Sequence, residues 1–535
     1  MSASNPKFNM LENFPFYLIL IFAIVMIMMV ANKIKVAYPI LLIVAGLLTS
    51  FIPGIPNITI NPEFIFLIFL PPLLYEAAWA ISWKELWHWR RIILSFAFVV
   101  VFLTAFSVAL VANYFIPGFG LALGFLLGGI VSPPDAVSAG AILKFVKVPR
   151  SISSILEGES LLNDASSLII FRFALVAVST TQFIFSQAVV SFSWMVFGGI
   201  AIGLLIGWIF MKLHKYLPTD ANMDIVFTLV MPYIIYLTAE EAHCSGVLSV
   251  VSAGLYLSYN RHSFLSSESR VRGYNVWQSL IFVMNGLVFT LIGLSLPAVT
   301  AGLEREGVSF NSAVGYGMLI TLVLVVIRFL AAYGAVITTL IMRNFIKIAD
   351  AGNPGLKGPF IIGWTGMRGV VSLAAALSIP VKLSNGNDFP QRNLILFITF
   401  VVILLTLILQ GLTLPYFIRR LQIMTPEQEA EEQKQYKQLK YEMAAFAVVQ
   451  LQNQYGKALE EQPILQKIAD KWEHSKMLTE DTEMTAEGKI IYISILRQQR
   501  KWLIQHNRKN GNIDEGIVRR HLHQLDMEEE KVKHL

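Results

Sequence analysis

The chain has 535 residues, of which 55% are hydrophobic, and its mean hydropathy is +0.59. This composition excludes a soluble globular protein of this size. The only cysteine, Cys244, excludes an intrachain disulfide. The net charge of +6 could indicate an anionic partner, but the distribution of the charges explains it better, and we expect no nucleic-acid partner.

Apolar runs of about 20 residues recur along the chain, each long enough to cross about 30 Å of hydrocarbon. We therefore predict an all-α polytopic membrane protein with about thirteen spans in residues 1–420. The predicted spans are 14–31, 36–52, 62–80, 91–113, 117–143, 153–179, 187–211, 222–240, 243–259, 274–296, 310–342, 359–380 and 391–418.

Basic residues mark alternate loops between these spans. The odd-numbered loops are rich in them, with Arg90 and Arg91 in the third loop and Arg270 and Arg272 in the ninth. By the positive-inside rule the odd loops are cytoplasmic, which predicts an outside N-terminus and an inside C-terminus. The even-numbered loops carry only Arg305, Lys382 and Arg392.

Residues 421–535 are charged and rich in glutamine, which predicts a helical cytosolic tail. Helices are expected over 426–455, 462–476 and 486–506, followed by a last short helix. A regulatory module and a passive cytosolic cap remain equally open as roles for this tail.

Two predicted spans cannot be continuous helices. Residues 128–140 contain Ser-Pro-Pro-Asp, and adjacent prolines remove two backbone donors. Residues 363–372 contain three glycines in seven positions, which weaken a helix. Broken backbone at membrane depth is tolerated only inside protein or beside a water-filled cavity. A pair of broken helices in the two halves of a membrane protein indicates an inverted repeat around a transport site.

The sixth span carries the densest group of polar residues, Glu-Gly-Glu-Ser-Leu-Leu-Asn-Asp at 157–164. A carboxylate at bilayer depth costs about 2.5–3.5 kcal/mol, so Asp164 is expected to handle ions or protons. Ser160 lies one helical turn before Asp164 on the same face. Their hard oxygens suit a dehydrated alkali cation such as Na⁺, and carbonyls freed around Pro134 could add ligands.

The arginines in the spans need partners, because a buried guanidinium requires a carboxylate. Glu159 faces away from the stripe of Ser160 and Asp164, so it is the natural partner. Arg328 and Arg368 compete for Glu159, and we favour Arg328. Arg368 could instead hold the broken twelfth span together.

Three further acidic residues are ambiguous from the sequence. Glu76, late in the third span, either tunes Asp135 or Asp164 through water or simply ends a helix. Glu240 and Glu241 fall at a span end, where we expect them to be solvated.

These motifs resemble the sodium/proton exchanger branch of the monovalent cation:proton antiporters, particularly its bacterial members. The resemblance covers nearly the whole membrane region. Its motifs are Glu-Gly-Glu-Ser-Leu-Leu-Asn-Asp (157–164), Leu-Pro-Pro-Leu-Leu-Tyr-Glu (70–76), Arg-Phe-Leu-Ala-Ala-Tyr (328–333) and Gly-Met-Arg-Gly-Val-Val-Ser-Leu (366–373).

The resemblance implies a role for each matching residue. The cation and proton site would comprise Asp164, Ser160, Asp135, Glu76 and the Pro134 carbonyl, with Na⁺ at Asp164 and Ser160. A stabilising ion pair would join Glu159 and Arg328, closed by Asn163. The chain departs from the family at Pro134, where a threonine is usual, so the site lacks that hydroxyl but keeps the backbone carbonyl. The resemblance also implies homodimers with a dimerisation domain, a mobile six-helix core and two discontinuous helices that cross.

One carboxylate shared by a cation and a proton predicts a secondary antiporter that exchanges Na⁺, and Li⁺, for H⁺ at one to one. Such a protein belongs in the cell membrane, contributes to pH homeostasis and is not an enzyme. It needs no cofactor besides its transported ions. A K⁺/H⁺ antiporter is the nearest alternative and a cation channel is more distant.

Overall fold

The computed structural model describes residues 10–52, 62–143, 145–180, 185–342, 355–383, 386–423, 426–474, 486–509 and 513–534. Within these ranges every regular element is a helix, apart from one isolated bridge between Lys382 and Asp388. The predicted all-α class is therefore confirmed.

In the first half of the membrane region, the described residues form eight α-helices and one π-helical segment before the long helix that carries the 157–164 motif. Those elements are α1 (Met10–Ile34), α2 (Tyr38–Ser50), α3 (Pro62–Ala80), α4 (Trp83–His88), α5 (Arg90–Leu94), η1 (Ser95–Val100), α6 (Val101–Phe115), α7 (Leu121–Val131), α8 (Ala136–Leu143) and α9 (Arg150–Thr180).

The second half contains further long helices and a second broken span. Its elements are α10 (Phe185–Ser193), η2 (Trp194–Gly198), α11 (Gly199–Tyr216), α12 (Ala221–Glu241), α13 (Gly246–Phe264), α14 (Ser267–Arg305), α15 (Phe310–Met342), α16 (Lys357–Trp364), α17 (Val370–Leu377), α18 (Arg392–Leu405), η3 (Thr406–Gln410) and α19 (Gly411–Leu421).

Eight helices among the described residues are long and apolar enough to cross a membrane, and three more apolar helices are shorter. Large apolar side chains also lie on the outer surface, such as Phe22, which is 67% exposed, and Phe197, which is 72% exposed. Because water would disfavour such a surface and lipid would not, the protein is an integral membrane protein. The count of thirteen spans remains a prediction.

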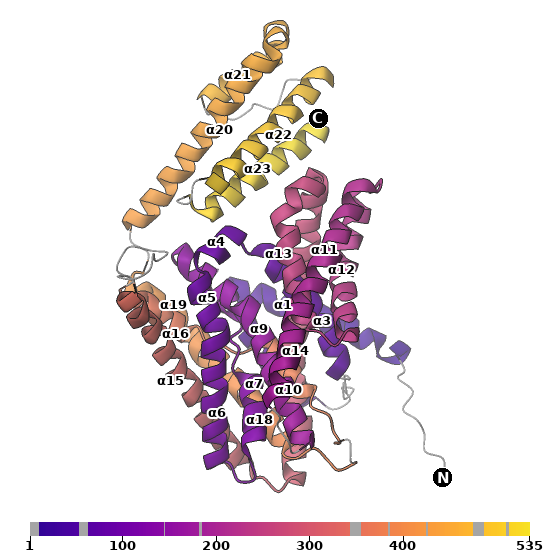
Figure 1. Ribbon diagram of the computed structural model, residues 1–535, viewed down its shortest axis with the longest axis vertical. Helices are drawn as coiled ribbons and strands as arrows, with labels where there is room; N and C mark the ends of the chain where they lie inside the picture. Colours follow the sequence, from indigo (N-terminus) through magenta and orange to yellow (C-terminus); the bar gives the residue numbers. More distant parts are fainter. Residues whose placement is uncertain are drawn as a thin grey trace.

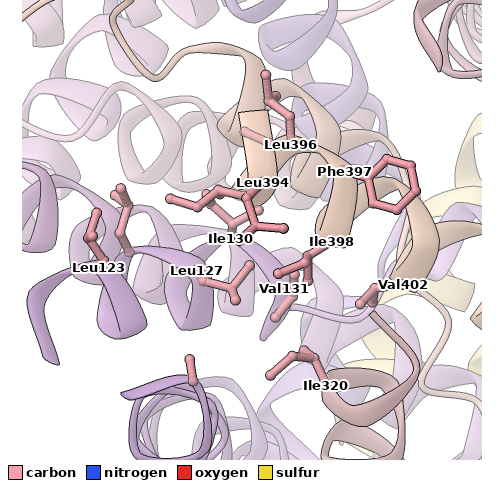
Figure 2. Packing of buried hydrophobic residues seen from close by; sticks show 14 of the residues in the cluster. Leu123, Leu127, Ile130, Val131, Ile320, Leu394, Leu396, Phe397, Ile398 and Val402 are labelled. Atoms are coloured by element: carbon pink, nitrogen blue, oxygen red, sulfur yellow. The ribbon is translucent and has the colours of Figure 1, made fainter. Parts of the chain in front are cut away.

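The membrane helices divide into two bundles. Helices α1, α2 and α3 pack mainly with α11 to α14, and we call this group the first bundle. Helices α6, α7 and α9 pack mainly with one another, and α6 and α7 also pack with α15, α17 and α18. We call α6, α7, α9 and α15 to α18 the second bundle. Figure 2 shows the core of the second bundle, where Leu127 and Ile130 of α7 meet Leu394 and Ile398 of α18.

The tail comprises α20 (Pro426–Glu461), α21 (Pro463–His474), α22 (Ala486–Lys509) and α23 (Glu515–His534). These four helices share one hydrophobic cluster and lie over one end of the membrane helices (Figure 1). We call this end the tail end. The last helix is not short, as the sequence predicted, but has 20 residues, because its apolar side chains pack against α22.

Candidate functional site

Both predicted breaks are present, and they meet. The first lies between Val131 at the end of α7 and Ala136 at the start of α8, and the second lies between α16 and α17. The backbone N–H of Asp135 donates a 2.7 Å hydrogen bond to the carbonyl of Met367, which joins the two breaks directly. The prediction of two crossing discontinuous helices is therefore confirmed.

Arg368 holds the carbonyl ends of both broken helices. Its Nε donates to the Val131 carbonyl at 2.8 Å, its Nη2 to the Ser132 carbonyl at 3.2 Å, and its Nη1 to the Gly366 carbonyl. Val131 is the last residue of α7, Ser132 follows it, and Gly366 lies two residues beyond the end of α16. The C-terminal ends of helices carry partial negative charge. The buried guanidinium is thus compensated by backbone dipoles.

The carboxylate of Asp135 lies at a helix N-terminus, where it compensates charge of the opposite sign. Its Oδ1 accepts from the N–H of Val137 at 3.0 Å, and its Oδ2 accepts from the N–H of Ser138 at 3.3 Å and from the Ser138 hydroxyl. The carboxylate therefore caps α8, where partial positive charge gathers. A Cβ at Gly369 would lie 2.0 Å from Asp135 Oδ2, so only glycine fits beside this carboxylate.

Asp164 lies in the middle of α9, is only 7% exposed, and sits within electrostatic range of Asp135. Among the described residues no cationic side chain pairs with it. Ser160 lies one turn earlier on the same helix, as the sequence predicted. An unpaired carboxylate in this position has a strong need for a proton or a bound cation.

Glu159 pairs with Arg328 rather than with Arg368. Arg328 Nη2 donates to Glu159 Oε2 at 2.7 Å, and Arg328 Nη1 donates to Oε1. Both side chains are almost fully buried, and the Phe96 ring covers the guanidinium at 5.1 Å. Phe96 lies in the π-helical segment η1, a kind of irregularity that often accompanies functional sites. This pair locks α9 to α15 beside the aspartates.

Asn163 connects α9 to the first break. Its Nδ2 donates to the carbonyl of Pro134 at 3.1 Å. This contact occupies one of the two lone pairs of a carbonyl that the sequence proposed as a cation ligand, and it leaves the other lone pair available. Asn163 thus positions Pro134 instead of closing the ion pair of Glu159.

Glu76 lies in α3, in the first bundle, and is half-buried. The hydroxyl group of Tyr38, at the start of α2, lies within electrostatic range of both Glu76 and Asp135. The sequence singled out Glu76 and missed Tyr38, because nothing in the local pattern separates this tyrosine from other aromatic residues near a span end.

An ion pair that the sequence did not predict joins the two bundles at the end opposite the tail. Arg172 Nη2 of α9 donates to both oxygens of Glu240 in α12, at 2.8 and 2.7 Å. Glu240 Oε1 also accepts from the N–H of Gly246 at 3.1 Å. Glu240 was expected to be solvated, and this expectation is wrong because α9 brings a guanidinium to it.

Two broken helices that cross beside an unpaired carboxylate, within a bundle of membrane helices, define a secondary ion transporter. Comparison with known proteins agrees with this class. The family described as "Sodium/hydrogen exchanger, transmembrane" matches residues 19–420, and the chain belongs to that family. Its members are transporters and not enzymes.

Related proteins support the same assignment. A "Sodium, potassium, lithium and rubidium/H(+) antiporter" of Bacillus subtilis is 34% identical over 70% of this chain, and the match spans only 57% of that protein. The "Na(+)/H(+) antiporter ApNhaP" of Aphanothece halophytica is 32% identical over 72% of this chain and 70% of its own length. The fold is similar to that of the sodium proton antiporter MjNhaP1 from Methanocaldococcus jannaschii, with a TM-score of 0.61 and 19% identity over 75% of this chain and 99% of that chain.

Proposed function

We propose that this protein exchanges a monovalent cation, Na⁺ or Li⁺, for H⁺ across the cell membrane. The observation that carries this proposal is the unpaired, buried carboxylate of Asp164 beside the crossing of the two broken helices. Asp164 and Ser160 supply the cation ligands, and the free lone pair of the Pro134 carbonyl adds a third. Glu76 tunes the approach from the first bundle.

Competition at Asp164 couples the two fluxes. A bound cation favours the ionised carboxylate, whereas a proton removes the charge that holds the cation. Each ligand therefore expels the other. If the second bundle moves only when Asp164 is neutralised, neither ion crosses without the other. The movement would be a rigid-body shift of the second bundle against the first around this site.

The neighbouring groups favour an exchange of one cation for one proton. Asn163 carries no charge, Asp135 is engaged as a helix cap, and Glu159 is paired with Arg328. Of these four residues on α9 and the first break, Asp164 is the one that we propose changes its charge during a cycle. Such exchange moves no net charge, so it gains nothing from a membrane potential worth about 2.3 kcal/mol per charge per 100 mV.

This proposal is tested with the purified protein in liposomes that contain a pH-sensitive dye. Addition of Na⁺ or Li⁺ outside should drive H⁺ movement, and clamping the potential with K⁺ and valinomycin at 0 or about −100 mV should leave the initial rate unchanged. A rate that follows the clamped potential would refute the one-to-one stoichiometry, and a current through single molecules would indicate a channel.

A K⁺/H⁺ antiporter is the second candidate. The Bacillus relative named above is described as acting on sodium, potassium, lithium and rubidium, and Pro134 replaces the threonine hydroxyl that is usual in the family. Fewer hydroxyl ligands favour a larger ion that is held less tightly. Comparable rates with K⁺ and Na⁺ in the same liposomes, with potential clamped by other means, would favour this candidate.

The ion pair of Arg172 and Glu240 should bias the proposed movement, because it joins the two bundles at one end only. Both side chains are partly exposed, at 41% and 29%, so the pair is expected to contribute about 0.2–1 kcal/mol. Arg172→Glu should shift the apparent Km by about two- to fivefold for Na⁺ that is added on the side opposite the tail. The charge-swapped double variant, Arg172→Glu with Glu240→Arg, should restore it, and failure of the swap would show that no pairing acts here.

We further propose that the protein is a homodimer in the cell membrane, with its N-terminus outside and its tail in the cytoplasm. The charge pattern of the loops supports this orientation. In this role the exchanger contributes to pH homeostasis.

A further inference from the structure

The tail contacts both bundles at once. On the first bundle, Arg270 at the start of α14 pairs with Asp526 of α23, with a 2.6 Å Nη2–Oδ1 distance and both side chains only 8% exposed. Arg500 of α22 completes this cluster, because its Nη2 lies 2.7 Å from Asp526 Oδ1 and 2.7 Å from Glu529 Oε2. Buried charges that are paired in this way attach α22 and α23 firmly to the first bundle.

Two aromatic contacts strengthen the same attachment. The rings of Tyr274 in α14 and His523 in α23 lie 5.9 Å apart, and the guanidinium of Arg508 lies 4.6 Å from the ring centre of Tyr259 in α13. Both tyrosines belong to the first bundle.

A second attachment joins the tail to the second bundle through α4. Lys84 Nζ donates to Asn507 Oδ1 of α22 at 2.6 Å and to the carbonyl of Ile513 at 3.1 Å. Helix α4 is itself seated on α9, where Gly158 leaves room for Leu86. The tail thereby contacts the helix that carries Asp164.

Arg150, the first residue of α9, adds to this second attachment. Its guanidinium lies beside Gly516 of α23, and its Nε lies 3.7 Å from Glu85 Oε1 of α4. The side chains of Arg150 and Glu85 are polar and partly exposed, whereas the charged cluster on the first bundle is buried. A relative shift of the two bundles would strain this weaker attachment before the stronger one.

We propose that α22 and α23 form a brace that restrains the movement of the second bundle against the first, and that release of the Lys84 attachment accelerates exchange. This inference rests on the proposed antiport and on its moving bundle. It gives the tail an inhibitory role that is exerted through a defined set of contacts.

Cross-linking tests the brace in the full-length protein. Because Cys244 is the only cysteine, a Cys244→Ser background allows paired cysteines to be introduced cleanly. Lys84→Cys with Asn507→Cys, bridged by a short bismaleimide, would fix the tail to the second bundle and should stop Na⁺/H⁺ exchange in liposomes. Tyr274→Cys with His523→Cys is the matched control. It cross-links the tail to the first bundle, to which the tail is already firmly attached, so exchange should continue.

A release variant tests the opposite direction. Lys84→Met keeps the length of the side chain and removes the hydrogen bonds, so exchange should become about two- to fivefold faster, as expected for one partly exposed charged contact. Unchanged exchange after complete 84–507 cross-linking, or a slower rate in a well-folded Lys84→Met protein, would overturn the brace. Absence of exchange in the unmodified protein would instead overturn the antiport itself.

Glu85 makes the attachment of the tail to α4 dependent on pH. Burial, together with Asp514 and Glu515, raises the pKa of this carboxyl to about 7, while Arg150 and Arg519 oppose the shift, and Lys84 is its neighbour in the chain. A carboxyl whose pKa is raised by docking favours the docked state while it is protonated, and this contribution is lost as the pH rises through about 7. The brace should therefore loosen at alkaline pH.

A variant that cannot ionise at this position tests the pH dependence. Glu85→Gln should match the wild type at pH 6 and exchange more slowly than the wild type at pH 8, because its brace stays closed. Equal rates of the two proteins at pH 8 would show that Glu85 does not control the attachment.

Discussion

Asp164→Asn is expected to reduce exchange in liposomes by about 100-fold or more, to the leak of protein-free vesicles. The amide is nearly the same size as the carboxyl group but cannot release a proton and carries no charge for a cation. Because the substitution removes a charge that is costly to bury, the folded protein should not lose stability. The measurement is the initial rate of dye dequenching after addition of Na⁺, at matched protein content.

Two variants make this experiment specific. Asp164→Glu keeps a carboxylate and should retain exchange with an altered apparent Km for Na⁺. Asp388→Asn makes the same chemical change at an exposed position in the connection between α17 and α18 and should behave as the wild type. Normal exchange by Asp164→Asn would mean that another group carries the proton, and the proposed competition would be wrong.

Arg328→Met is expected to give the largest loss of stability. It leaves the Glu159 carboxylate buried and unpaired, which typically costs about 3–5 kcal/mol. The purified protein should unfold at a clearly lower temperature in detergent. Adding Glu159→Gln should recover part of this loss, because the double variant no longer buries a lone charge.

The same series separates a structural role of Glu159 from a role in transport. If the ion pair only holds α9 against α15, the double variant should exchange ions wherever it is folded. Arg172→Met, which breaks a partly exposed pair on the same helix, is the control and should cost only about 0.2–1 kcal/mol. A folded double variant without exchange would show that Glu159 takes part in transport.

The structure assigns different tasks to residues that looked equivalent in the sequence. Arg328 and Arg368 were both candidates for Glu159, and only Arg328 reaches it. Arg368 instead binds backbone carbonyls, a type of partner that no charge pattern can reveal. Asp135 stays a predicted cation and proton ligand, and the structure adds that its carboxylate caps the N-terminus of α8. Asp164 has no such cap and no cationic partner among the described residues, which is why we propose it as the carboxylate that exchanges a proton for a cation.

The sequence by itself determined the helical class, the two broken helices and the stripe of Ser160 and Asp164. Each of these features depends on composition, on proline and glycine, or on the period of a single helix, and all are local properties of the chain. Only the tertiary structure decided that Arg172 meets Glu240 and that Lys84 meets Asn507. Those contacts join residues that are 68 and 423 positions apart, and they depend on how whole helices rotate and pack against one another.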